Sequence, residues 1–210
     1  MSTWICDLTR VRRGIGLRVI CLAAFMPLAA CLDPVMGEPS AQEALRAVAF
    51  YDGAVTVAGP RGYCIDRASI KQDAGGRFAL LASCESLTGQ SGITVDPAVM
   101  TVAVLPRTGA TAAPDAAEMS RALDPGAVRH AEAGDGVTLI HIAAGGETVL
   151  PGGDPAHWRA SMIINGHIVG LAAYGPKGGR VAGPTGRDLL RDLAEALRRA
   201  SAPRGAPTSG

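Results

Sequence analysis

The sequence WRASMIINGHIVGLAAY, residues 158–174, decides the fold because it carries the most specific local signal in the chain. Its Asn165-Gly166 dipeptide is the favoured two-residue turn of a β-hairpin, and apolar runs of strand length flank it on both sides. This turn predicts antiparallel pairs whose residue numbers sum to 331. One face of the hairpin then carries the side chains that we expect in the core: Trp158, Ala160, Met162, Ile164, Val169, Leu171 and Ala173. The opposite face is mixed, with His157, Arg159, Ser161, Ile163, Ile168 and Tyr174.

A long helix is predicted after the hairpin, from a cap at Thr185 to about residue 200. Its leucines recur at helical spacing and form one apolar stripe, made of Leu189, Leu190, Leu193 and Leu197. Upstream, a capping box at Ser40 and apolar spacing predict further helices over 40–50 and 114–123. Apolar runs predict strands over 54–58, 63–66, 77–83, 99–105, 128–133 and 137–143. This order favours an α+β domain, a mainly antiparallel sheet with an N-terminal, a middle and a long C-terminal helix packed on it.

The composition limits the class of protein. The 210 residues are 48% hydrophobic and 19% charged, with a formal net charge of +1. High hydrophobicity excludes an intrinsically disordered chain, and near-neutral charge lacks the cationic surface with which nucleic-acid-binding proteins hold phosphates. No segment offers about 20 uninterrupted apolar residues, so the pattern is not that of a multi-span membrane protein. We expect no nucleic-acid partner.

The N-terminus has the parts of an export signal. Four arginines precede an apolar run at 19–30, which as a helix is only about 18 Å long and therefore shorter than a membrane span. The run ends in Leu28-Ala29-Ala30-Cys31, which resembles the lipobox of bacterial lipoproteins. In that family the cysteine thiol carries diacylglycerol, the peptide is cut just before the cysteine, and the new amine is acylated, for example with palmitate.

The lipobox resemblance implies a membrane anchor at Cys31 and a division of the chain. It gives a signal peptide at 1–30, a lipidated tether at 31–40, one domain at 41–200 and a disordered tail at 201–210. It also implies the periplasmic side of a bacterial cell envelope. Leu32 stands where aspartate would favour the inner membrane, so the outer membrane is favoured if the host has one. An ordinary cleaved signal peptide with a coincidental cysteine stays the alternative.

Two further cysteines, Cys64 and Cys84, form an even pair for an oxidising compartment. A disulfide between them would close a loop of about 21 residues and stabilise the fold by about 3 kcal/mol in the chain-entropy model. We expect this bond to connect the strand at 63–66 with the end of the strand at 77–83. Two free buried thiols are the alternative.

The order of elements, with a long closing helix after a strong hairpin, resembles the PsbP-like fold. This is the sandwich of the photosystem II extrinsic proteins, and it also occurs in bacterial lipoproteins. The resemblance covers 41–200 and implies a sandwich architecture, but it identifies no functional residue.

The usual catalytic motifs are missing from the sequence, including HExxH, GxSxG, SxxK and the glycine-rich phosphate loops. The spacing of the four histidines gives no local metal pair, so we assign no catalytic residue, no metal and no cofactor. His141 is either a ligand or base, or a side chain satisfied by a backbone carbonyl, which the pattern favours. The glycine-rich stretch 145–153 is either a lid or anion-binding loop, or a plain surface turn.

These patterns favour a lipid-anchored, non-catalytic envelope domain that binds a protein or another envelope component. The candidate ligand or partner surface consists of His141, His157, Arg159 and Tyr174. Two alternatives stay open: a small-ligand- or lipid-binding lipoprotein, and an envelope enzyme in which His141 meets Asp154 or Ser161. An apolar cavity would favour the ligand carrier, and a pocket at His141 would favour the enzyme. An exposed apolar patch would favour the partner-binding domain.

Overall fold

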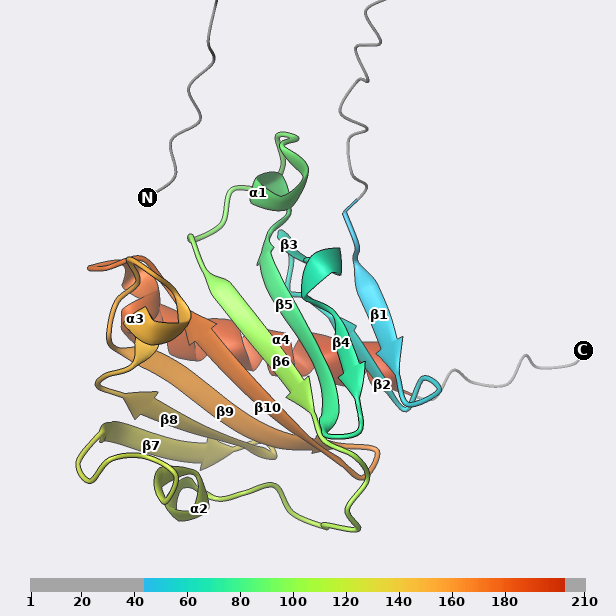
Figure 1. Ribbon diagram of the computed structural model, residues 1–210, viewed down its shortest axis with the longest axis vertical. Coiled ribbons are helices and arrows are strands. Elements are labelled where there is room, and N and C mark those ends of the chain that lie inside the picture. Colours follow the sequence, from blue (N-terminus) through green and yellow to red (C-terminus); the bar gives the residue numbers. More distant parts are fainter. Residues whose placement is uncertain (1–43, 203–210) are drawn as a thin grey trace, which may run out of the picture. The chain divides into compact units, whose positions relative to one another are not determined.

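A computed structural model describes residues 44–202 of the protein (Figure 1). The predicted signal peptide, Cys31, the tether and the capping box at Ser40 lie outside the described residues, as does the predicted tail from residue 203 onward.

An eight-stranded sheet forms the main body of the described chain (Figure 1). Its strands are β3 (Tyr63–Ile65), β4 (Lys71–Asp73), β5 (Gly76–Ser83), β6 (Val99–Val104), β7 (Val128–Gly134), β8 (Val137–Ile142), β9 (His157–Ile164) and β10 (His167–Tyr174). The order is β3-β5-β6-β10-β9-β8-β7, and β4 also pairs with β5. A separate two-stranded sheet pairs β1 (Ala47–Phe50) with β2 (Val55–Ala58). Every strand pairing in residues 44–202 is antiparallel, as the sequence predicts.

The β9–β10 hairpin has the predicted register. His167 pairs with Ile164 and Ala173 with Trp158, so that partner numbers sum to 331. Asn165 and Gly166 both adopt positive φ, at 47° and 81°, as the favoured turn requires. All seven side chains assigned to the core face are buried, which confirms that assignment.

The long C-terminal helix α4 (Pro184–Ser201) packs behind the sheet in Figure 1 and contacts β2, β8, β9 and β10. Its four predicted leucines are buried. Two boundaries differ from the prediction. The N-cap is Gly183 rather than Thr185, because Pro184 takes the first helical position, where its missing N–H is not needed. Ser201 belongs to the helix and not to a tail, since it is buried and its hydroxyl accepts a hydrogen bond from the Thr56 N–H at 2.9 Å.

The helix predicted over 40–50 is wrong for its described part, because residues 47–50 form β1. Pairing with β2 puts Phe50 opposite Val55 and buries both completely. The gain from that burial outweighs the modest intrinsic helix preference of an alanine-rich segment. A turn with positive φ at Tyr51, Asp52 and Gly53 returns the chain into β2.

The short helices are only partly as predicted. The middle helix α2 (Ala116–Ser120) is shorter than the predicted span 114–123, and it begins at a capping box between Asp115 and Glu118. Two further short helices, α1 (Cys84–Thr88) and α3 (Gly146–Val149), are not expected from the sequence. The turn residues 71–76 include the short strand β4, and the turn itself joins Asp73 to Gly76. Two single 3₁₀ turns, η1 (Arg67–Ser69) and η2 (Arg180–Ala182), complete the elements.

The two faces of the main sheet have different surroundings. The face toward α4, which we call the helix face, carries the hydrophobic core, including Met100, Val102, Met162, Leu171 and the leucines of α4. The opposite face, which we call the open face, is turned to the viewer in Figure 1, and in the described chain no helix lies across β5 and β6 there. The protein is therefore an α+β protein with an antiparallel sheet and a long C-terminal helix on one face.

Candidate functional site

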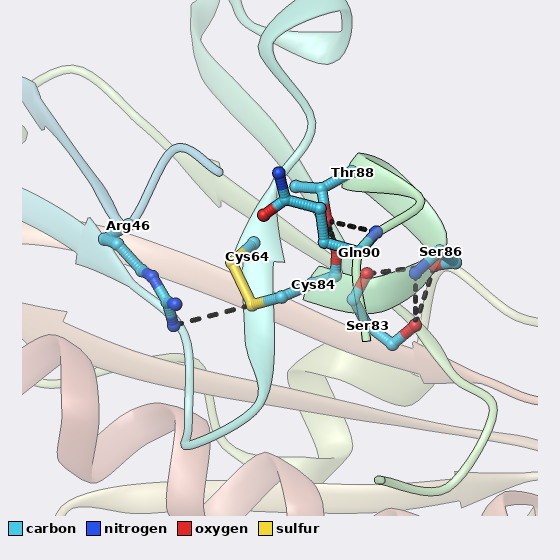
Figure 2. The surroundings of a disulfide bond; sticks show 7 residues. All are labelled: Arg46, Cys64, Ser83, Cys84, Ser86, Thr88 and Gln90. Atoms are coloured by element: carbon cyan, nitrogen blue, oxygen red, sulfur yellow. Dashed lines mark hydrogen bonds between the residues drawn. A yellow bond between two sulfur atoms is a disulfide. The ribbon is translucent and has the colours of Figure 1, made fainter. Parts of the chain in front are cut away.

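The Cys64–Cys84 disulfide is present in the structure and lies at one end of β5 (Figure 2). Cys64 sits in β3 opposite Ala82 of β5, and Cys84 is the first residue of α1. The bond thus connects an edge strand to the helix that follows β5, as expected in outline. Figure 2 shows Arg46 pointing at this bond, with its Nη1 3.6 Å from the Cys84 sulfur. The surrounding serine and threonine hydroxyls form hydrogen bonds within the α1 turn, so we interpret this region as one that stabilises the fold.

His141 has a structural environment on the helix face. Its Nε2 donates to the carbonyl of Ala182 at 2.9 Å, and its ring stacks on Trp158 with centroids 4.6 Å apart. Burial lowers the pKa of His141 below its usual value of 6.5, although the Ala182 carbonyl acts in the opposite direction. This is the backbone-satisfied histidine that the sequence pattern favours.

His157 and Tyr174 are together, but they are not exposed. Both are buried, and their rings stack with centroids 5.0 Å apart. The Nδ1 of His157 lies 3.2 Å from the Pro155 carbonyl, while its Nε2 is buried without a hydrogen-bond partner in the described chain. Burial lowers the pKa of His157 below its usual value of 6.5. A partner surface cannot use these two side chains as they stand.

The residues of the enzyme hypothesis are not hydrogen-bonded to one another in the described chain. His141 pairs with Trp158 and shares its face, whereas Ser161 pairs with Thr138 on the opposite face of the sheet. Asp154 uses its carboxylate on the N–H groups of Ala156 and Gly178, each at 2.9 Å, and these bonds lower its pKa. Ser161 is buried, and its hydroxyl has no partner among residues 44–202.

The glycine-rich stretch 145–153 contains the single helical turn α3. Gly146 is buried, and its N–H donates to the Pro155 carbonyl at 2.9 Å. A side chain at Gly146 would collide with the Asp154 carbonyl, so the glycine permits a close backbone approach. The stretch is therefore fixed by its own backbone contacts, which fits the plain-turn interpretation better than a lid.

The open face presents a mostly apolar surface over β5, β6, β9 and β10. The strand registers place on it Phe78, Leu80, Thr101, Ala103, Arg159, Ile163 and Ile168. Ala103 is exposed and the other six are half-buried. Arg159 is the single charged side chain in this set, and it lies between Ile140 and Ala172 in the register. Of the four residues predicted as a partner surface, only Arg159 lies on this accessible part.

Two hollows continue the open face at its ends. One, of about 280 Å³, lies between β4 and β6 and includes Phe78, Ala103 and the exposed Leu105 in its lining. The other, of about 480 Å³, lies beyond the far ends of β5 and β6. Its lining is largely apolar and includes Ala82, Val95, Pro97, Val99, Leu150 and Pro151.

Sequence reasoning missed most of the open face. The alternation along 77–83 places Phe78 and Leu80 on one side, but it does not say which neighbours that side has. Only the strand order, with β6 between β5 and β10, joins Phe78 to Ile168 in one surface. The mixed character of the hairpin's second face, with Ile163 and Ile168 beside Arg159, was the available signal.

Comparisons with known proteins do not assign the chain to a family. No protein-family model matches it, and no curated protein matches it either. A solved structure of a mutant of the protein Mog1 is similar, with 14% sequence identity and a TM-score of 0.41, over 73% of this chain and 93% of that chain. Likeness at this level carries no inference about function.

Two features of the described residues bear on the remaining site classes. Within 44–202 no cluster of three or more histidine, cysteine, aspartate or glutamate side chains is placed to hold a metal ion. No helix in the same part of the chain is long and apolar enough to cross a membrane.

Proposed function

We propose that the protein is a lipid-anchored, non-catalytic domain of the bacterial envelope that binds a protein or another envelope component through the open face. The observation that carries this proposal is the half-exposed apolar surface formed by Phe78, Leu80, Ile163 and Ile168, with Arg159 among them. Contiguous apolar surface with an arginine is typical of the centres of protein interfaces. The hydrophobic core is complete on the helix face, so the apolar side chains of the open face are not needed to form that core.

A photo-crosslinking amino acid at Ala103 tests the binding surface. Ala103 is exposed, and its cross-strand partner Gly170 carries no side chain, so a bulky probe fits without displacing a neighbouring side chain there. The matched control is the same probe at Glu195, an exposed position on the outer side of α4. In intact cells we expect one discrete adduct from Ala103 and none of that mass from Glu195. Equal adduct patterns from both positions would contradict the proposal.

The anchor is proposed from the sequence Leu28-Ala29-Ala30-Cys31. Intact mass of the protein from its native membrane fraction, with and without reduction, tests it. We expect a species that begins at Cys31, is heavier by acyl groups, and gains the mass of two hydrogens on reduction of Cys64–Cys84. A mass that fits the uncleaved chain, or a cleaved soluble form without lipid, would overturn the anchor. Membrane fractionation of the same sample tests the proposed outer-membrane, periplasm-facing location.

We also propose that the domain has the PsbP-like sandwich architecture. Support comes from the antiparallel sheet and from the β9–β10 hairpin followed by a long closing helix. An experimental structure superposed on PsbP-like domains tests it. A common strand order over 41–200 would support the proposal, and a different order would overturn it.

A second candidate function is the binding of a small apolar ligand or lipid. The hollow of about 480 Å³ favours it, because its apolar lining and size are typical of small-molecule sites. A fluorescent fatty acid titrated into the protein tests this candidate. Quenching by Val99→Trp, which places an indole in the lining, would support binding there, whereas Ile168→Trp on the open face serves as the control.

A further inference from the structure

A polar cavity of about 1030 Å³ lies apart from the proposed binding surface. Its lining comes from six parts of the chain: the β1–β2 hairpin, β4, the start of β5, the segment after β6, the β9–β10 turn and the last residues of α4. Arg77 belongs to its lining and pairs with Val104, whose side chain is in the core of the helix face. The cavity therefore opens on the helix-face side of the sheet, and the function proposed above involves no residue on that side.

The Arg77 guanidinium is held in a fixed position at this cavity. Its Nη1 donates to the carbonyls of Asp73 at 2.5 Å and Gly76 at 3.1 Å. The guanidinium lies over the Tyr51 ring, 4.6 Å from the centroid, in a cation–π contact. Its Nε is buried and has no hydrogen-bond partner in the described chain. No carboxylate in residues 44–202 forms an ion pair with Arg77.

Tyr51 is the centre of a stack that sets this geometry. Its other neighbour is the His167 ring, 4.3 Å away between centroids, and its hydroxyl donates to the Val104 carbonyl at 3.3 Å. Tyr51 and Asp52 both have positive φ, at 50° and 55°, a costly conformation for residues with side chains. Such strain is retained where surrounding contacts hold the residue in place, and it clusters at binding sites.

Arg107 supplies a second guanidinium to the cavity. It lies against the Gly166 backbone, where an added Cβ would be 2.7 Å from its Nε. It is exposed and has no ion pair within residues 44–202. Among the described residues that line the cavity, Asp52 is the single carboxylate, and the two arginines outnumber it.

The remaining lining accepts and donates hydrogen bonds. His167 uses Nδ1 as the donor to the Leu105 carbonyl at 2.9 Å, so Nε2 is the ring nitrogen that remains for a ligand. Gln72 adds an amide, and the closing residues of α4 add backbone carbonyls. Groups of this kind recognise hydroxyls, while guanidinium groups recognise phosphate or carboxylate.

We propose that this cavity binds a small hydroxylated anion, a sugar phosphate or sugar acid, with its anionic group between Arg77 and Arg107. The two arginines select the charge, and the Gln72 and His167 side of the cavity selects the hydroxyls. The same headgroup chemistry is presented by a free metabolite or by an anionic glycerol-containing lipid, and the test distinguishes these sources.

The test is calorimetric titration of the full-length, detergent-solubilised protein with glucose 6-phosphate, glucuronate and glucose at constant ionic strength. We expect both anionic sugars to bind and neutral glucose to bind at least tenfold more weakly. Arg107→Ala should weaken binding of the anionic sugars at least tenfold, because it removes one guanidinium without touching a hydrogen bond in the described fold. Arg61→Ala, also exposed and without an ion pair among residues 44–202, is the matched control and should bind as wild type does.

Three results would overturn the proposal: equal binding of glucose and glucose 6-phosphate, equal loss in both arginine variants, or no binding of either anionic sugar. Displacement of bound glucose 6-phosphate by phosphatidylglycerol, but not by phosphatidylcholine, each added as mixed micelles in the same detergent, would support it with a lipid headgroup as the source. Binding of glucose 6-phosphate that neither lipid displaces would support it with a free metabolite as the source. Unchanged melting temperatures in both variants establish that any loss of binding is not a loss of folding.

Discussion

The helix face and the open face of the main sheet are built from similar residue types but have different surroundings. On the helix face, Met100, Met162 and Leu193 are fully excluded from solvent between the strands and α4. On the open face, Phe78, Leu80 and Ile168 are only half-buried and no helix covers β5 and β6 in the described chain. Apolar area removed from water stabilises the fold in proportion to the area, so the first set contributes more to stability than the second. The second set remains accessible to a binding partner.

The largest expected effect on stability comes from truncating a buried side chain on the helix face. Leu193→Ala should lower the free energy of unfolding by about 2–5 kcal/mol, because it removes a fully buried side chain and leaves a cavity. Ile168→Ala on the open face is the matched variant and should cost less than about 1.5 kcal/mol, since part of that side chain already contacts water. Urea unfolding followed by circular dichroism measures both. Similar losses in the two variants would show that the faces do not differ as described.

The disulfide should have the next largest effect. Replacing both Cys64 and Cys84 with alanine should lower the free energy of unfolding by about 3 kcal/mol. The disulfide links residues 20 positions apart, and without it the unfolded chain regains the conformational entropy that this loop had lost. The reduced wild-type protein is the control and should unfold at the same urea concentration as the double variant. The bond lies beside β5 on the open-face side, so its loss should leave the register of β9–β10 unchanged. An unaltered urea midpoint in both samples would refute its stabilising role.

A smaller effect is expected from pH. Burial lowers the pKa of His157, so the folded protein binds a proton less readily than the unfolded chain, whose histidines titrate near 6.5. Well above pH 6.5 neither state carries the proton and the contribution is absent. As the pH falls below 6.5 the unfolded state binds protons first, so stability decreases until the pH passes the lowered folded-state pKa. His141 adds to the same trend, since burial also lowers its pKa.

The variant His157→Phe isolates the buried histidine, because phenylalanine keeps an aromatic ring against Tyr174 but does not titrate. Urea unfolding at a series of pH values between 8 and 4 measures the difference. We expect a flatter dependence of stability on pH in the variant than in the wild type. The same acid dependence in both proteins would assign the effect to other groups.

The parts of the fold that were predictable are those specified by neighbouring residues. The Asn165-Gly166 turn fixes the register of β9 with β10, and the leucine spacing of 189–197 fixes the buried side of α4. The failure over 47–50 has a non-local cause, because that segment is a strand only through its pairing with β2. The disulfide was predictable because only two cysteines fall in the predicted domain.

The candidate sites were less predictable for the same reason. Register alone places His141 and Ser161 on opposite faces, but the β8–β9 register was not available from a local motif. The open face depends on the position of β6 between β5 and β10, and the polar cavity joins Tyr51, Arg77, Arg107 and His167 from four distant segments. Surfaces assembled by strand order leave little trace in a single sequence.

The central claim is that the open face serves binding and contributes less to stability than the helix face, and one measurement tests its binding role most directly. The yield of the Ala103 photo-adduct is compared between the wild-type background and Ile168→Asp, which places a charge in the apolar surface. The account predicts that the adduct falls at least tenfold in Ile168→Asp while the protein stays folded and present at the wild-type level. An undiminished adduct from the folded variant would contradict it.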